Sequence, residues 1–116
     1  MKLKEIIQKM VEENRFKAAL LTNSAGLTLV GFPDGPEAEM PAAMIALLQR
    51  TFEKVQNHVG LRAMSEMLLC DEVGQKLVCC RFIAGGNDLI LALLVPPNRL
   101  YRQALEKAIE QIKQIW

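Results

Sequence analysis

The pattern of apolar and polar positions along the chain predicts three helices and five strands. Apolar residues that recur every three or four positions indicate helices at Leu3–Val11, with a stop near Asn14, at Glu37–Val59, which Gly60 ends, and from a cap at Asn98 to the end of the chain. Short apolar stretches bounded by glycine, proline, asparagine or aspartate indicate strands at Phe16–Thr22, Leu27–Phe32, Ala63–Cys70, Gln75–Ile83 and Asp88–Val95.

The turns between these strands predict how the strands pair. The links Asn23–Gly26, Asp71–Gly74 and Ala84–Asn87 are short and rich in turn-forming residues, so each joins two antiparallel neighbours. The last strand is apolar on both faces, which is typical of the centre of a sheet, whereas the strand from Ala63 contains Ser65 and Glu66 and suits an edge. We therefore predict an α+β fold with a five-stranded antiparallel sheet in the order 2-1-5-4-3. The long helix crosses one face, and the two terminal helices cover the other.

The long helix has two sides of different character. We expect its wide apolar arc to pack on the protein's own sheet; this arc contains Met40, Met44, Ile45, Leu47, Leu48, Phe52, Val55 and Val59. The opposite side contains a row of small and polar residues, Ala42, Ala46, Gln49 and Glu53. Small side chains allow a second helix to approach closely, so this row is predicted to face a partner. The alternative is a solvated face rich in alanine, the best helix former.

The predicted edge strand also favours association. An edge strand exposes unpaired backbone groups, and Met64, Met67, Leu68 and Leu69 do little to protect this one from pairing with another chain. A second copy related by a two-fold axis would satisfy those groups. We therefore predict a dimer interface that comprises Ala42, Ala46, Gln49, Glu53, Met64, Glu66 and Leu68.

Length and charge narrow the class of protein. A chain of 116 residues forms one domain, residues 1–116, and its 14 basic and 13 acidic residues give a net charge of +1. This balance argues against nucleic-acid binding through a basic field. The longest apolar run, Leu89–Val95, is far shorter than a membrane-spanning helix, and the N-terminus lacks a signal-peptide pattern. We expect no membrane insertion and a cytoplasmic location.

No group of residues has the pattern of a catalytic, cofactor or metal site. Cys70, Cys79 and Cys80 lack CxxC spacing, and His58 is the single histidine, so we expect free, buried thiols and no metal. Cys79 and Cys80 are neighbours on one strand and should point to opposite faces. Ser24 lacks the G-x-S-x-G context of a nucleophile, and Gly85 belongs to a hairpin turn rather than to a phosphate-binding loop. The chain is therefore predicted not to be an enzyme and to need no cofactor.

Three segments carry a resemblance to a known family. AALLTNSAGLTLVGF at 18–32, EMPAAMIALLQRTFEKV at 39–55 and LILALLVPPN at 89–98, in this order, resemble the roadblock/LC7 family, which is related to the longin and profilin-like folds. The family commonly has an acidic residue before the glycine of its first turn, where this chain has Ser24, Ala25 and Gly26. The resemblance implies homodimers or heterodimers in which the long helices pair and edge strands join two sheets. It also implies a bacterial type of regulator or scaffold for a small Ras-like GTPase that need not supply an arginine finger.

The predicted GTPase-binding surface lies beside the helix pair. It comprises Arg50, Lys54, Gln56 and Asn57, which are polar and close to the proposed contact between the helices. One alternative is a small-molecule sensor of the profilin, PAS or GAF kind, for which the inward polar candidates are Thr28, Cys79, Cys80 and Arg81. Another alternative is a dimeric adaptor without a GTPase partner. The sequence leaves open the identity of the GTPase, the direction of regulation and the choice between homodimer and heterodimer.

Overall fold

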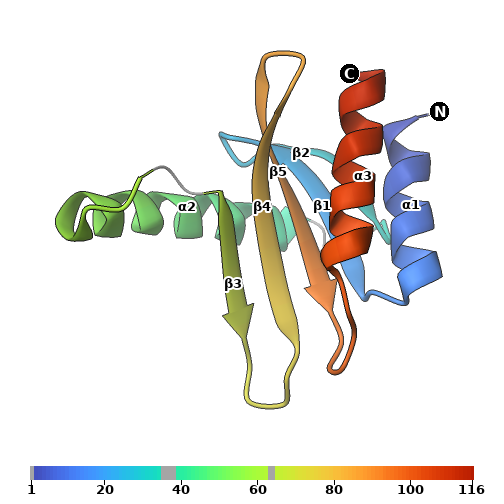
Figure 1. Cartoon of the computed structure of the whole chain (residues 1–116), viewed down its shortest axis with the longest axis horizontal. Coiled ribbons are helices and arrows are strands. Elements are labelled where there is room, and N and C mark those ends of the chain that lie inside the picture. Colours follow the sequence, from blue (N-terminus) through green and yellow to red (C-terminus); the bar gives the residue numbers. More distant parts are fainter. Residues whose placement is uncertain (1, 35–38, 63–64) are drawn as a thin grey trace.

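The computed structural model describes residues 2–34, 39–62 and 65–116, with all of their side chains except those of residues 39–42. Its elements follow the predicted order (Figure 1) and are α1 (Leu3–Asn14), β1 (Ala18–Asn23), β2 (Thr28–Phe32), α2 (Glu39–Val59), β3 (Glu66–Cys70), β4 (Lys76–Ala84), β5 (Asn87–Val95) and α3 (Arg102–Ile115). The strands form one antiparallel sheet in the order β2-β1-β5-β4-β3. The predicted fold class and strand order are confirmed.

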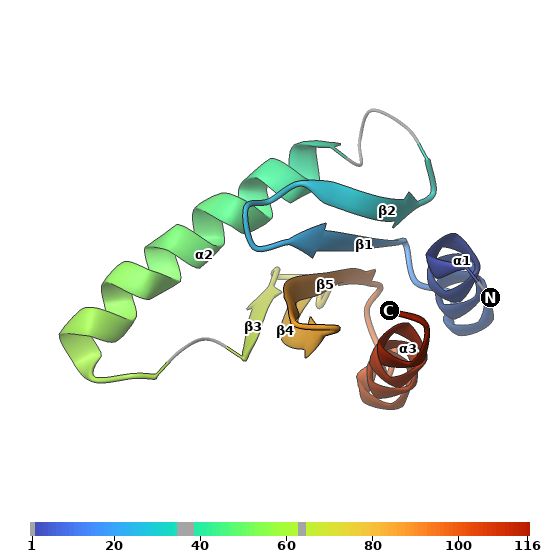
Figure 2. The same cartoon turned by 90° about the horizontal axis from the view of Figure 1, so that it is seen from above.

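The sheet separates the helices into two layers. Helix α2 lies on one side of it, and α1 and α3 lie together on the other (Figure 2). The larger apolar core is between the sheet and the pair α1 and α3, where Ile7, Leu21, Leu93 and Ile112 have no exposed surface. A much smaller core lies between the sheet and α2 and is built around Leu20, Ile45, Cys79, Ile90 and Ala92.

Strand β5 occupies the centre because both of its faces are apolar. Leu89, Leu91 and Leu93 belong to the core under α1 and α3, while Ile90 and Ala92 belong to the core under α2. Strand β1 is also buried on both faces, as predicted for the first hairpin. The same prediction is wrong for β2, where Thr28 and Leu29 are exposed because β2 is an edge strand that α2 does not cover.

The ends of two helices agree with the sequence. Helix α1 ends at Asn14, and α2 ends where the N–H of Gly60 donates to the carbonyl oxygen of Gln56, with a φ of 76° at the glycine. Asn98 is not the cap of the last helix. It has a φ of 60° and lies in a turn, so α3 begins only at Arg102. Within the described residues, none of the helices has both the length and the hydropathy that crossing a bilayer requires.

The hairpin between β4 and β5 turns through two glycines. Gly85 and Gly86 have φ values of 56° and 78°, which is the geometry of a type I′ turn. The indole ring of Trp116, at the end of α3, covers Gly85 so closely that a Cβ there would lie 2.4 Å from Cδ1 of the ring. The tryptophan therefore packs on the turn.

The contact between Trp116 and Gly85 gives a first prediction. Alanine at either glycine is strained by its positive φ, at a cost of about 1 kcal/mol. The Gly85→Ala variant also displaces Trp116, whereas a Cβ at Gly86 meets nothing within 4 Å. Urea denaturation should therefore show a greater loss of stability for Gly85→Ala than for Gly86→Ala. Equal losses would mean that the indole ring does not pack on the turn.

Asp71 holds the turn between β3 and β4. Its Oδ1 accepts hydrogen bonds from the N–H groups of Val73 and Gln75, at 3.1 and 2.8 Å, and its Oδ2 accepts one from the Gln75 side chain at 2.9 Å. Loss of surrounding water by itself raises the pKa of the Asp71 carboxyl group. The hydrogen bonds lower this pKa by a larger amount, so the pKa lies below its ordinary value of 3.8.

This lowered pKa gives a second prediction, for the variant Asp71→Asn. The carboxylate stabilises the folded protein fully above its unfolded pKa of about 3.9, and the contribution is lost as the pH falls through the lower folded pKa. The variant should therefore be less stable than the wild type at pH 7, and the difference should shrink below about pH 4. Urea titrations of both proteins over this range measure it. A difference that does not change with pH would contradict the assignment.

Candidate functional site

Only a narrow stripe of α2 contacts the sheet. Ile45 and Ala46 are the buried residues among the described side chains of this helix, and Leu48, Gln49, Phe52 and Gln56 are half-buried. Ile45, Gln49, Phe52 and Gln56 follow one another at intervals of three or four positions, as one face of a helix requires. The C-terminal half of α2 projects away from the sheet (Figure 2). The chain therefore leaves most of its longest helix without cover.

The predicted division of α2 into two sides is partly wrong. Met44, Leu47 and Val59 were expected to pack on the sheet, but they are 53%, 60% and 62% exposed, and Val55 is exposed as well. Ala46 was expected to face a partner and is instead buried within the chain. The error arises because α2 diverges from the sheet, so that one stripe rather than a wide arc touches it. Of the other residues in that row, Gln49 is half-buried, Glu53 is exposed, and the side chain of Ala42 lies outside the described residues.

An apolar cavity of about 340 Å³ lies beside the N-terminal half of α2. Met44 and Ile45 of the helix line it together with Leu77 and Leu94 of the sheet, and Lys17 is its one charged lining residue. The ammonium group of Lys17 donates to the side-chain oxygen of Gln75 rather than into the apolar space. The flank of α2 that contains Met44 therefore faces a part of the sheet that the described residues do not fill.

Strand β3 is the second open feature. It is the outermost strand, it pairs with β4 alone, and its residues Leu68 and Leu69 are 44% and 46% exposed. The predicted interface residue Met64 lies outside the described residues. Glu66 does not stand free at this edge, since its carboxylate binds the guanidinium of Arg102 through two hydrogen bonds of 2.7 and 3.0 Å. These bonds raise the pKa of Arg102 and fasten β3 to the start of α3.

The opposite edge of the sheet is partly protected. Nζ of Lys4, on α1, donates to the carbonyl oxygen of Gly31 at 2.6 Å and to Oδ1 of Asp34 at 2.5 Å, and it lies over the ring of Phe32. A lysine on an edge strand hinders the addition of another strand. Within the described part of the chain, no lysine side chain forms a corresponding hydrogen bond to the backbone of β3. The sheet therefore has one guarded edge and one open edge.

The predicted GTPase-binding residues do not all lie together. Arg50, Lys54 and Asn57 are exposed and occupy one flank of α2, whereas Gln56 is half-buried and belongs to the stripe that faces the sheet. The structure thus brings three of the four residues to one surface. Their role as partner contacts stays a prediction.

Sequence reasoning missed an ion pair on the α2 side of the sheet. Nε and Nη2 of Arg81 donate to the two carboxylate oxygens of Asp88, each at 2.8 Å, across the β4–β5 hairpin. This hydrogen bonding raises the pKa of Arg81, and the negative charges of Asp88 and of Glu53 on α2 add to the shift, although burial opposes it. This ion pair depends on the strand register, which pairs Ile83 with Asp88 and places Arg81 two residue pairs away, on the same face of the sheet.

The cysteines offer no reactive group under α2. Cys79 and Cys80 belong to the cores on opposite faces of the sheet, as predicted. Burial raises the pKa of the Cys79 thiol to about 11, so this sulfur is a poor nucleophile at neutral pH. Cys70 is exposed, which corrects the prediction that all three thiols are buried. Among the described residues, no three His, Cys, Asp or Glu side chains gather where they could hold a metal ion.

Comparison with known proteins identifies the fold. No protein-family model and no curated protein matches this sequence. Among solved structures, MglB of Myxococcus xanthus is 13% identical and matches with a TM-score of 0.80 over 99% of this chain and 94% of that one. A roadblock/LC7 domain from Streptomyces avermitilis is 15% identical, with a TM-score of 0.78 over 99% and 95% of the two chains. The gliding protein MglB of Thermus thermophilus is 17% identical, with a TM-score of 0.77 over 97% and 87%.

These likenesses extend over almost the whole chain and agree with the strand order, the single helix on one face and the helix pair on the other. The chain therefore has the roadblock/LC7 fold.

Proposed function

We propose that two copies of this chain, or one copy and another roadblock protein, form a dimer that binds a small Ras-like GTPase and regulates or scaffolds it without supplying a catalytic residue. The observation that supports dimerisation most strongly is the coincidence of two uncovered features. An apolar flank of α2 and the edge strand β3 are both left open.

Pairing between β3 strands would satisfy the open edge. A two-fold axis beside β3 joins two five-stranded sheets into one, with each β3 donating to and accepting from its antiparallel twin. Leu68 is then enclosed between neighbouring strands instead of lying at a margin. The ion pair between Glu66 and Arg102 keeps β3 extended and attached to its own domain, so little order has to be imposed when the second copy arrives.

The same axis would bring the α2 helices together. Because α2 projects past its own sheet, its exposed residues Val55 and Val59 are available to the second copy, and the second copy's helix is available to the open part of the first sheet. Complete burial of one large apolar side chain stabilises a complex by roughly 1.5–3 kcal/mol before the cost of association. A stable interface of this type should bury on the order of 1,000 Å² or more.

The cavity favours a protein side chain over a small molecule as its occupant. Ligand pockets usually combine apolar walls with a few converging polar groups. Here the polar candidates for a sensor diverge: Thr28 is exposed on β2, Cys80 points to the other face, and Arg81 is paired with Asp88. The hydroxyl group of Thr22 is buried without a partner among the described residues, but Thr22 does not line the cavity. Met44 and the second copy's apolar flank fill such a space without polar groups.

The GTPase part of the proposal rests on the resemblance to the roadblock family and on the fold. Arg50, Lys54 and Asn57 are exposed polar residues on one flank of α2, and they are our candidates for contact with the GTPase. An adaptor without a GTPase partner would use the same dimer.

Charge on the apolar flank should dissociate the dimer. We expect Val55→Asp to give a monomer, because two carboxylates would be buried without partners between the helices. Leu100→Asp is the matched control, since Leu100 is 93% exposed and lies in the segment before α3, away from α2. Light scattering coupled to size exclusion should report one chain for Val55→Asp and two for Leu100→Asp and the wild type. A wild type that stays a single chain at high concentration contradicts the proposal.

GTPase binding should depend on the bound nucleotide. With the organism's own Ras-like GTPase immobilised, we expect the wild-type dimer to bind the form with a non-hydrolysable GTP analogue more tightly than the GDP form. Comparing GTP hydrolysis with and without the dimer then separates an activator from a scaffold. Equal binding to both nucleotide forms would remove regulation from the proposal and leave an adaptor.

A further inference from the structure

We infer that each copy of the chain binds the GTPase through a stepped, positively charged surface that fits an acidic, convex surface of the GTPase. We call this surface the cationic step. The cationic step consists of Arg50 and Lys54 on α2, Arg62 in the segment after α2, and Ile83 on the raised β4–β5 hairpin. This inference rests on the proposed function, because it names the chemistry by which the GTPase would be held.

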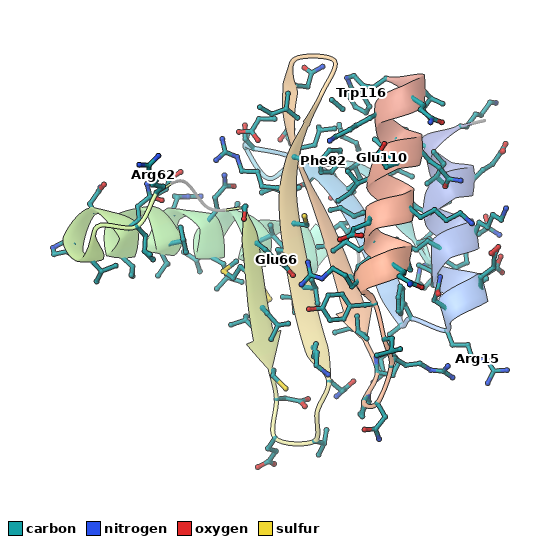
Figure 3. All side chains as sticks on the ribbon, in the orientation of Figure 1. Arg15, Arg62, Glu66, Phe82, Glu110 and Trp116 are labelled. Atoms are coloured by element: carbon teal, nitrogen blue, oxygen red, sulfur yellow. The ribbon has the colours of Figure 1, made fainter. Side chains whose placement is uncertain are left out.

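The step has the shape of an inside corner. The β4–β5 hairpin rises well beyond the level at which α2 crosses the sheet (Figure 1). Arg62 lies on the side of α2 that is towards the raised end of the hairpin (Figure 3). The helix is therefore one side of the corner, and the α2 side of the hairpin is the other.

Two observations place Ile83 and the polar flank of α2 on the inner sides of this corner. Ile83 follows Cys79 and Arg81 at alternate positions of β4, and Cys79 belongs to the core under α2, so all three lie on the α2 side of the sheet. Glu53 is near enough to Arg81 for its negative charge to contribute to the raised pKa of Arg81, so the flank of α2 that contains Glu53 lies on the side of the hairpin. Arg50 and Asn57 lie one helical turn from Glu53 on that flank, and Lys54 lies one turn from Arg50 on its outer side.

The charges in the corner leave a local excess of positive charge. Arg81 is neutralised by Asp88 in a two-bond pair, and Glu53 is the remaining acid. Within the described residues, no carboxylate lies within 4.0 Å of the cationic groups of Arg50, Lys54 or Arg62. The chain as a whole is nearly neutral, at +1, so this concentration of cations is a local feature and not a consequence of general basicity.

Shape and composition favour a protein as the acidic partner. A bilayer is flat on the scale of one domain and would touch the raised hairpin before it reached the helix. Ile83 is 62% exposed and offers an apolar contact on the hairpin side of the step, and protein interfaces commonly combine apolar and charged residues in this way. Charge complementarity of this kind accelerates encounter and excludes wrong partners.

Charge reversal tests the inference directly. The wild-type chain and two double variants are titrated against the Ras-like GTPase loaded with a non-hydrolysable GTP analogue, at low and high salt. Arg50→Glu with Lys54→Glu reverses two charges in the step, and Lys9→Glu with Lys107→Glu is the matched control on α1 and α3. We expect the first pair to weaken binding at least about tenfold, the control to change it less than about twofold, and wild-type affinity to fall as salt rises.

A further variant and a vesicle experiment keep the outcomes distinct. Ile83→Ser should also weaken binding, although it changes no charge. If the GTPase binds the wild type and both double variants equally, the inference is wrong and the proposed function stands. If the GTPase does not bind the chain in either nucleotide state, both the inference and the proposed function are wrong. If the step reversal abolishes sedimentation with phosphatidylserine vesicles but not GTPase binding, the step is a membrane contact and the inference is overturned.

Discussion

The structure depends on one geometric constraint: the longest and most apolar helix is held to its sheet along a single stripe and then leaves it. Ile45 and Phe52 make the contact, while Met44, Leu47 and Val59 face outward. A folded domain gains little from exposing such side chains in one row, and an exposed apolar row commonly marks an interface. The large core beneath α1 and α3 stabilises the sheet independently, so the layer that contains α2 is free to serve association.

The polar contacts of the sheet divide its two edges by function. Lys4 donates to the carbonyl oxygen of Gly31 beside β2, and Arg102 holds Glu66 on β3 by its side chain while leaving the outer backbone of that strand open. Exposed ion pairs of this type contribute at most about 1 kcal/mol to stability. These contacts matter mainly because they position the two edge strands. One edge is discouraged from pairing, and the other is kept extended and ready to pair.

The sequence was sufficient for the layers of the fold because those follow from periodicity and turn chemistry. The apolar residues on both faces of β5 and the glycine turn at Gly85 and Gly86 are local signals, and they led directly to the strand order. The faces of α2 were assigned wrongly at Met44 and Ala46 because the angle between the helix and the sheet is not a local property. The partner of Arg102 could not be predicted locally either, because Arg102 binds Glu66, which is 36 residues away in the sequence.

The proposed partner surface shows the same limit. Arg50, Lys54 and Asn57 share a flank because helical spacing requires it, whereas Gln56 turns to the sheet and Ile83 joins the surface only through the hairpin. Arg81 and Asp88 come together through strand register, which short-range patterns do not specify. Residues that meet through one element were therefore predictable, and residues that meet between elements were not.

Hydrogen–deuterium exchange of the backbone amides of β3 tests the central claim most directly. If two copies join through this strand, its outward-facing amides, those of Glu66, Leu68 and Cys70, exchange slowly at high protein concentration and speed up on dilution, while those of the guarded strand β2 do not respond. If the amides of β3 exchange at the same fast rate at every concentration, the open edge is not an interface and the account is contradicted.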